Sequence, residues 1–209
     1  DTYTVVASHA YPDSGAYTVT VTVRAEGGNV ASGALTVTVH DVAPTIALRG
    51  DGAAEEGAAY ALTLGEITDP GEDTVTEWLV DWGDGASPTR LTAETYPLDG
   101  VLTHRYADGP SAPLISVDLV DDDGTREEAG SLSVTIHNVV PTIALAGAPT
   151  VDEGAVYTLT LGEIADPGDD TVTAWRVTWG DGEEDVYTSG GDVAHIYADG
   201  LGSLTIGVA

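Results

Sequence analysis

The sequence predicts an all-β protein built from antiparallel β-sandwiches, and three observations support that prediction. Apolar residues make up 42% of the 209-residue chain, and they are weighted toward β-branched and aromatic types. There are 26 Gly and 10 Pro residues, which supply frequent turns. Between these turns, short stretches alternate apolar with polar residues, and no stretch has a helical period.

The chain repeats itself with a period of 97 residues. The segment Ala43–Leu48 (APTIAL) returns as Val140–Leu145 (VPTIAL), and Glu55–Gly85 returns as Asp152–Gly182. A His-X-Tyr motif occurs once in each copy, at His9, His104 and His195. The last two histidines are 91 residues apart, so the later copy is six residues shorter before its motif.

These matches divide the chain into three parts. They are the C-terminal part of one repeat (1–41), a complete repeat (42–138) and the N-terminal part of a third repeat (139–209). A 41-residue part of a sandwich buries too little apolar surface to be stable alone. We therefore expect the chain to be an excerpt from a longer tandem array, and the alternative is that strands from elsewhere complete its partial repeats.

Alternation orients the strands expected within the complete repeat. Each expected strand places its apolar residues on one face, at 46–48, 60–64, 78–82, 115–119 and 132–136. Trp78, Val80 and Trp82 share a face of the third strand, so burial in the core is the default expectation for both tryptophans. Short antiparallel strands over roughly 100 residues are typical of an immunoglobulin-like sandwich.

The charge of the chain excludes several functions. Its 35 Asp and Glu residues outnumber 6 Lys and Arg residues, giving a formal net charge of −29. A chain with so few cations lacks the positive surface that nucleic acids and anionic membranes require. It has no cysteine and no apolar run long enough to span a bilayer. No nucleophile elbow or phosphate-binding loop occurs, so we expect no enzymatic activity.

A set of ordered motifs resembles a known family. The motifs are E-G-X-X-Y-X-L-T-L-G, D-P-G-X-D-T-V-T, W-G-D-G, His-X-Tyr and V-D-L-V-D-D-D-G, ending in H-N-V-V-P-T. Together they cover essentially the whole chain and are similar to the polycystic-kidney-disease-type (PKD) repeats of large secreted bacterial proteins and repeats-in-toxin-type adhesins. The resemblance implies tandem immunoglobulin-like (PKD-like) antiparallel β-sandwiches in an extracellular spacer or adhesive module stiffened by calcium.

Acidic residues recur at the strand ends of each copy, where calcium ligands could converge. Calcium takes six to eight oxygen ligands from carboxylates and carbonyls on turns. Our candidate ligands are Glu56, Asp69, Asp73, Asp121, Asp123, Asn138, Glu153, Asp166 and Asp170. Glu is a poor turn former, so its recurrence before Gly57 and Gly154 favours a role as a ligand. Asp84 and Asp181 of the W-G-D-G turns rank below these, because Asp commonly caps such turns.

The linkers support the same expectation. Pro44 and Pro141 stiffen the short connections between repeats, and Asp41 and Asn138 lie beside them. We therefore predict a non-enzymatic, extracellular or cell-surface spacer of a bacterial adhesin-like protein, whose partners are neighbouring repeats. Two alternatives remain open. One is a self-assembling filament or surface-layer subunit formed from copies of the chain, although the two partial repeats together exceed one repeat in length. The other is a glycan-binding or protein-binding adhesive module.

Overall fold

The structure is a computed structural model that describes residues 4–200 and 202–209. Every regular element in the described residues is a β-strand, and every pairing whose register is described is antiparallel, so the predicted all-β fold class is confirmed. Within these residues there is no helix long and apolar enough to cross a membrane.

The strands belong to three sequence repeats. The first repeat contains β1 (Gly15–Arg24) and β2 (Val30–Val39). The second contains β3 (Thr45–Gly50), β4 (Ala53–Glu55), β5 (Ala59–Thr68), β6 (Glu77–Asp81), β7 (Thr89–Thr92), β8 (Val101–Arg105), β9 (Leu114–Val120), β10 (Thr125–Ser133) and β11 (Thr135–His137). The third contains β12 (Thr142–Gly147), β13 (Val156–Ala165), β14 (Trp175–Thr178), β15 (Glu184–Tyr187), β16 (Gly191–Ile196) and β17 (Gly207–Val208).

The chain forms two compact units whose limits cut across the second repeat. The first unit extends to Gly52 and also contains Tyr60–His104 and Ala112–Thr135. The second unit contains Ile136–Ala209 together with two segments of the second repeat, Ala53–Ala59 and Arg105–Ser111. Those two segments therefore pack with residues that follow them far along the sequence.

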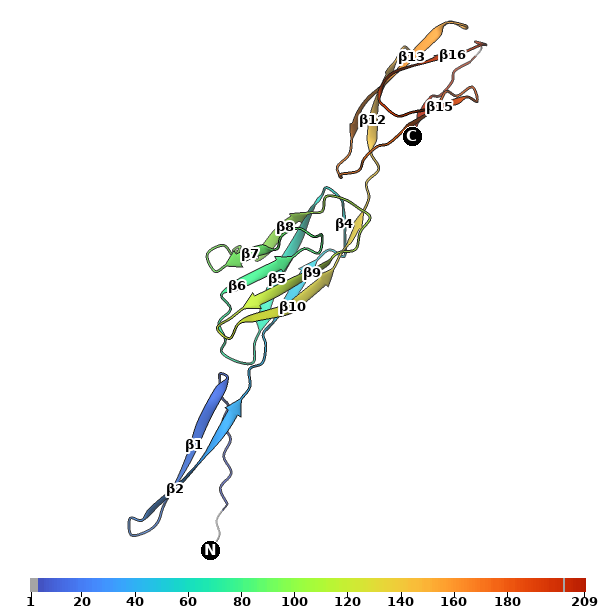
Figure 1. Ribbon diagram of the computed structural model, residues 1–209. Coiled ribbons are helices and arrows are strands. Elements are labelled where there is room, and N and C mark those ends of the chain that lie inside the picture. The colour runs from blue at the N-terminus through green and yellow to red at the C-terminus, as the bar shows by residue number, and fades with distance from the viewer. Residues whose placement is uncertain (1–3, 201) are drawn as a thin grey trace. The chain divides into compact units, whose positions relative to one another are not determined.

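The second repeat is an immunoglobulin-like arrangement of two antiparallel sheets. One sheet has the strand order β3-β5-β8, and the other has the order β10-β9-β6-β7 (Figure 1). Strand β6 lies between β7 and β9, with Trp78 opposite Leu91 on one side and Leu119 on the other. The inward faces follow the predicted alternation, and the buried apolar residues of this repeat are Ile46, Tyr60, Leu62, Leu64, Val80, Trp82, Leu91, Tyr106, Ile115, Val117, Leu119, Val134 and Ile136.

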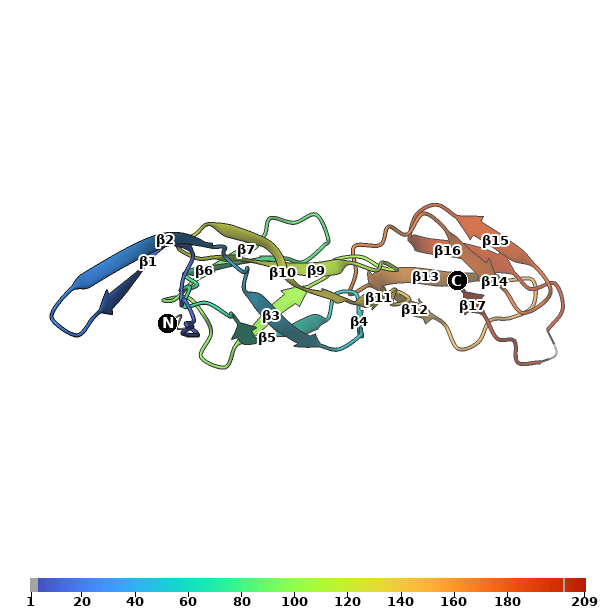
Figure 2. The same ribbon diagram turned by 90° about the horizontal axis from the view of Figure 1, so that it is seen from below.

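The third repeat uses the same plan in the second unit. One sheet has the order β12-β13-β16 and the other the order β15-β14-β17 (Figure 2). Its buried core consists of Leu159, Leu161, Val177, Trp179, Val193 and Tyr197. The Tyr197 hydroxyl donates a hydrogen bond to the Trp179 carbonyl at 3.1 Å. The tyrosine of the His-X-Tyr motif in this repeat therefore buries its ring and donates a hydrogen bond to the backbone.

The first repeat contributes one regular hairpin. Strands β1 and β2 pair with each other along ten residues, from Gly15 opposite Val39 to Arg24 opposite Val30. They form a sheet of two strands, and most of its residues are exposed. A hairpin of two strands has little core of its own, because burial on one face requires a further layer.

Candidate functional site

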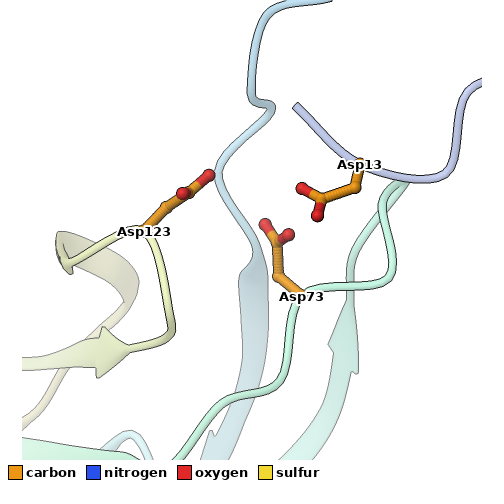
Figure 3. A group of neighbouring side chains, drawn as sticks. All are labelled: Asp13, Asp73 and Asp123. Atoms are coloured by element: carbon orange, nitrogen blue, oxygen red, sulfur yellow. The ribbon is translucent and has the colours of Figure 1, made fainter. Parts of the chain in front are cut away.

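Three carboxylates from separate loops meet in the first unit. Asp13 precedes β1, Asp73 lies between β5 and β6, and Asp123 lies in the turn between β9 and β10 (Figure 3). One carboxylate oxygen from each lies within 4.8 Å of the others. Asp13 and Asp123 are exposed, and Asp73 is half-buried. This separation allows one cation to contact all three side chains.

The electrostatics around Asp73 make its ionised form costly. Burial and a hydrogen bond with Asp41 are the main causes that raise the pKa of Asp73 to about 6. Neighbouring charges add to the shift, and they belong to Asp69, Asp41 and Asp122. The Oδ2 atoms of Asp69 and Asp73 are both buried without a hydrogen-bond partner. A cation would satisfy these oxygens and lower the repulsion between the carboxylates.

Asp121 has a different environment from the one predicted for a ligand. Its Oδ2 accepts a hydrogen bond from Arg126 Nε at 2.8 Å, and its Oδ1 accepts from the backbone amides of Asp123 and Gly124. Burial raises the pKa of Asp121, but Arg126 and these amides outweigh that effect and hold the pKa below its usual range. Arg126 also lies 3.0 Å from Asp41. The carboxylate of Asp121 is therefore already paired with a positively charged side chain, that of Arg126.

A second group of carboxylates lies in the second unit. It contains Glu56, Asp166 and Asp170, with one oxygen of each within 4.8 Å of the others. Glu56 is only 1% exposed, although it carries a carboxylate. Asp166 is half-buried, and its Oδ2 is buried without a hydrogen-bond partner. The structure thus brings together three of the residues that the sequence singled out.

Glu56 is held by backbone amides on both of its oxygens. Oε2 accepts a hydrogen bond from Gly109 N at 2.6 Å, and Oε1 accepts one from Val139 N at 2.8 Å. The surrounding backbone approaches closely, because a Cβ added at Gly168 would lie 2.6 Å from the Glu56 carboxyl carbon. A Cβ at Gly57 would lie 2.0 Å from the Pro167 carbonyl oxygen. These two glycines therefore allow the E-G turn to pack against the D-P-G turn.

The negative charges in and around this second group repel one another. Burial raises the pKa of Asp170, and the charges of Glu56, Asp166 and Asp108 raise it further. With its amide oriented to satisfy its neighbours, Asn138 donates a hydrogen bond to Asp170 Oδ2 at 3.0 Å. The group therefore contains clustered hard oxygen ligands, of the type that calcium prefers.

The two groups share one arrangement of loops. In the first unit the Glu72 amide donates to the Pro12 carbonyl, and in the second the Asp169 amide donates to the Ala107 carbonyl, both at 2.9 Å. Glu72 and Asp169 are 97 residues apart and occupy the same place in their D-P-G turns. Each group therefore joins a D-P-G turn to the His-X-Tyr loop of the preceding repeat.

Other predicted residues lie outside both groups. Glu153 is exposed, and Asp84 and Asp181 instead contact histidines. His104 Nε2 is 2.6 Å from Asp84 Oδ2, and His195 Nε2 is 2.7 Å from Asp181 Oδ2. Each histidine ring stacks on the tryptophan of the same W-G-D-G motif.

The candidate ligands predicted from the sequence did not include Asp13 and Asp108, which lie near these groups, and Asp41 was noted only as a linker residue. Asp13 and Asp108 had a detectable signal, because an Asp follows the histidine by four positions in every His-X-Tyr motif. Asp41 and Asn138 occupy equivalent linker positions, but only Asn138 was chosen as a candidate ligand.

The chain matches no known protein family, and no curated protein is similar to it. It is similar to a crystal structure of the chicken CNTN1 FN1–FN3 domains, with 12% sequence identity and a TM-score of 0.28. The match covers 83% of this chain and 64% of that chain. The immunoglobulin-like fold assignment therefore rests on the strand order and antiparallel pairing of the sheets themselves.

Proposed function

We propose that the chain is a non-enzymatic spacer of tandem PKD-like sandwiches, stiffened by calcium, in an extracellular or cell-surface adhesin-like protein of bacteria. One observation carries the calcium proposal. Each carboxylate group combines residues from two consecutive sequence repeats: Asp13 with Asp73 and Asp123 in one unit, and Glu56 with Asp166 and Asp170 in the other. A cation bound to such a group ties the loops of successive repeats together.

The chemistry of both groups fits a hard divalent cation. Buried carboxylate oxygens without hydrogen-bond partners occur on Asp73 of the first group, on the neighbouring Asp69, and on Asp166 of the second group. The residues that would hold calcium are Asp13, Asp69, Asp73 and Asp123 in the first unit, and Glu56, Asp166 and Asp170 in the second. Calcium would neutralise charges that otherwise repel each other across these loops.

The net charge suits a spacer that binds cations. A net charge of −29 keeps neighbouring chains soluble and apart, and it also increases the local concentration of cations. The partners of such a spacer are the adjacent repeats of its own array.

Thermal unfolding with calcium and with chelator tests this proposal. Calcium at 100 times its dissociation constant should stabilise a unit by about 2.7 kcal/mol, which raises its melting temperature by several degrees. The double variant Asp73→Asn and Asp170→Asn should lose most of that increase. Glu66→Gln removes an exposed carboxylate outside both groups and should retain it.

Ionic strength must be held constant, because any salt stabilises so acidic a chain by screening. Magnesium at the same concentration provides a second comparison, since it accepts such irregular oxygen sites less readily. Equal melting temperatures in calcium, magnesium and chelator would contradict the proposal. An equal calcium response in the double variant and in Glu66→Gln would contradict the assignment of the ligands.

A further inference from the structure

Arg126 is enclosed by the fold, unlike the other arginines of the chain. It lies at the start of β10, and its side chain is 18% exposed. The other five arginines are exposed. A long charged side chain is seldom enclosed unless it is paired with an opposite charge. The position of Arg126 therefore depends on the carboxylates that surround it.

Three carboxylates surround the Arg126 guanidinium. Its Nε atom donates a hydrogen bond to Asp121 Oδ2 at 2.8 Å. Its Nη2 atom lies 3.0 Å from Asp41 Oδ2 and 3.8 Å from Asp123 Oδ2. Asp121 and Asp123 belong to the turn before β10, whereas Asp41 lies between β2 and β3, in the linker that joins the first and second repeats. The guanidinium therefore connects this linker to a turn of the second repeat.

The same carboxylates contact other parts of the junction between these two repeats, which we call the first junction. Asp41 forms a hydrogen bond with Asp73 of the second repeat. Ser14, in the loop before β1, donates a hydrogen bond through Oγ to Asp123 Oδ2 at 3.2 Å. Asp73 and Asp123 both extend toward Asp13 of that loop (Figure 3). Two residues beside Arg126, Asp41 and Asp123, thus take part in contacts that join the two repeats.

The linker after the second repeat makes the equivalent contact without a second carboxyl. Asn138 is the counterpart of Asp41, and Asp170 is the counterpart of Asp73. Asn138 donates an amide hydrogen bond to Asp170 Oδ2 at 3.0 Å, whereas Asp41 places a carboxyl group against Asp73. Two ionised carboxylates repel each other unless a cation lies beside them. Arg126 supplies a positive charge beside Asp41.

We infer that Arg126 is a built-in cation that holds the linker against the second repeat and keeps the first junction ordered when calcium is absent. A guanidinium stays charged at all pH values below about 12, and its forked N–H groups can contact several carboxylates at once. A chelator removes a bound metal ion but leaves Arg126 in place. The inference goes beyond the proposed function, because the contacts that carry it contain no metal.

Hydrogen exchange in the presence of chelator tests this inference, with the Glu72 amide as the reporter. This amide donates to the Pro12 carbonyl at 2.9 Å, so it is protected while the loop before β1 lies against the second repeat. Arg126→Gln should speed its exchange by at least about tenfold, because Asp41 then loses its charged partner. The amides of β5 and β6 in the same sample show whether the second repeat remains folded.

Arg90→Gln is the matched control. It also removes an arginine from an ion pair, but Arg90 pairs with Glu77 on the neighbouring strand of the same sheet. Neither residue contacts the first repeat through this pair, so exchange at Glu72 should not change.

Two substitutions at Asp41 test the same contact from the linker, which lies outside the strands. Asp41→Ala should speed exchange at Glu72 about as much as Arg126→Gln does. Combining Asp41→Asn with Arg126→Gln should return the exchange rate to within about threefold of that of the unsubstituted chain. The new amide can donate to Asp73, as Asn138 donates to its own partner at the next junction.

A role of Arg126 confined to its own repeat predicts a different result. Loss of its bond to Asp121 alone would speed exchange at the amides of Asp123 and Gly124, which donate to Asp121, and leave Glu72 unchanged. That pattern would overturn the inference, and so would a double variant that exchanges as fast as Arg126→Gln. A chain that calcium does not stabilise would contradict the proposed function but would leave these expectations in chelator unchanged.

Discussion

The second and third repeats carry the same E-G turn, but the two turns have different environments. Glu56 of the second repeat is 1% exposed and accepts hydrogen bonds from Gly109 and Val139. Glu153 of the third repeat is exposed, and within the described residues no hydrogen bond reaches its carboxylate. The amide equivalent to that of Gly109 belongs to Gly200, and it donates to Asp199 instead.

The difference shows that the motif alone does not make a site. Glu56 is enclosed because the D-P-G turn at Asp166–Gly168 and the linker at Val139 pack around it within the second unit. With the 97-residue period, the positions equivalent to Val139 and Asp166–Gly168 would be 236 and 263–265, beyond the 209 residues of this sequence. The carboxylate of Glu56 is therefore buried and partnered through residues of the following repeat and its linker, not through the E-G turn alone.

Replacing these two glutamates should give the largest difference between the repeats. Glu56→Ala leaves the amides of Gly109 and Val139 without acceptors and should destabilise the second unit by about 3 kcal/mol. Glu153→Ala removes an exposed side chain and should change stability by about 0.5 kcal/mol or less. Thermal unfolding measures both effects, and hydrogen exchange at the amides of Gly109 and Val139 shows where the loss occurs.

Two outcomes of the substitutions Glu56→Ala and Glu153→Ala would contradict the expected difference between the two glutamates. Equal destabilisation by both substitutions would mean that the E-G turn acts within its own repeat. Destabilisation by Glu56→Ala without faster exchange at Gly109 and Val139 would mean that the carboxylate acts through something other than these hydrogen bonds.

The fold was more predictable from the sequence than the site. Alternation placed the inward faces of β3, β5, β6 and β9 correctly, because a buried face needs apolar residues at every second position. Strand β4 had no such signal, since it is three residues long and pairs with β11. The equivalent residues of the third repeat, 150–152, do not form a strand. Whether this segment forms a strand therefore depends on its pairing partner and not on its own sequence pattern.

The carboxylate groups were predictable only in part, because convergence depends on which loops meet. Repetition at equivalent turns singled out Asp73, Asp166 and Asp170. It could not show that Asp13, from an earlier repeat, would complete one group. It also could not show that Asp121 pairs with Arg126, because that contact depends on the geometry of the β9–β10 turn.

A substitution in a loop that the second repeat has and the third lacks should have an intermediate effect on stability. The second repeat has six more residues before its His-X-Tyr motif, and Tyr96 in that loop lies 4.7 Å from Trp78 between ring centroids. Tyr96→Ala should destabilise the first unit by about 1.5 kcal/mol, because it removes an aromatic pair and a hydrogen bond to the Leu64 carbonyl. It should also shift Trp78 fluorescence toward that of a more solvated ring.

The matched control for Tyr96 lies in the same loop. Leu98 is fully exposed, so Leu98→Ala should leave both the stability and the fluorescence unchanged. If Leu98→Ala destabilises the unit as much as Tyr96→Ala does, then the loop acts through its conformation and not through the aromatic contact.

The smallest effects should come from Asp84 and Asp181, where the two repeats are alike. The hydrogen bond from His195 is the main cause that lowers the pKa of Asp181 below its ordinary value of 3.8. Burial raises the pKa of Asp84, but the Ala86 amide and His104 outweigh it and lower the pKa overall. A carboxyl with a lowered folded-state pKa stabilises the fold fully above pH 3.8, and this contribution is lost as the pH falls through the folded-state value.

Asp84→Asn and Asp181→Asn should therefore each lower the melting temperature near neutral pH, and the difference from the unsubstituted chain should shrink in acid. Both motifs are complete within one repeat, since each histidine stacks on its own tryptophan and faces its own Asp. The two pH profiles should thus have the same shape, unlike the responses of Glu56 and Glu153. A profile that differs between Asp84 and Asp181 would show that the W-G-D-G motif, like the E-G turn, depends on what packs around its repeat.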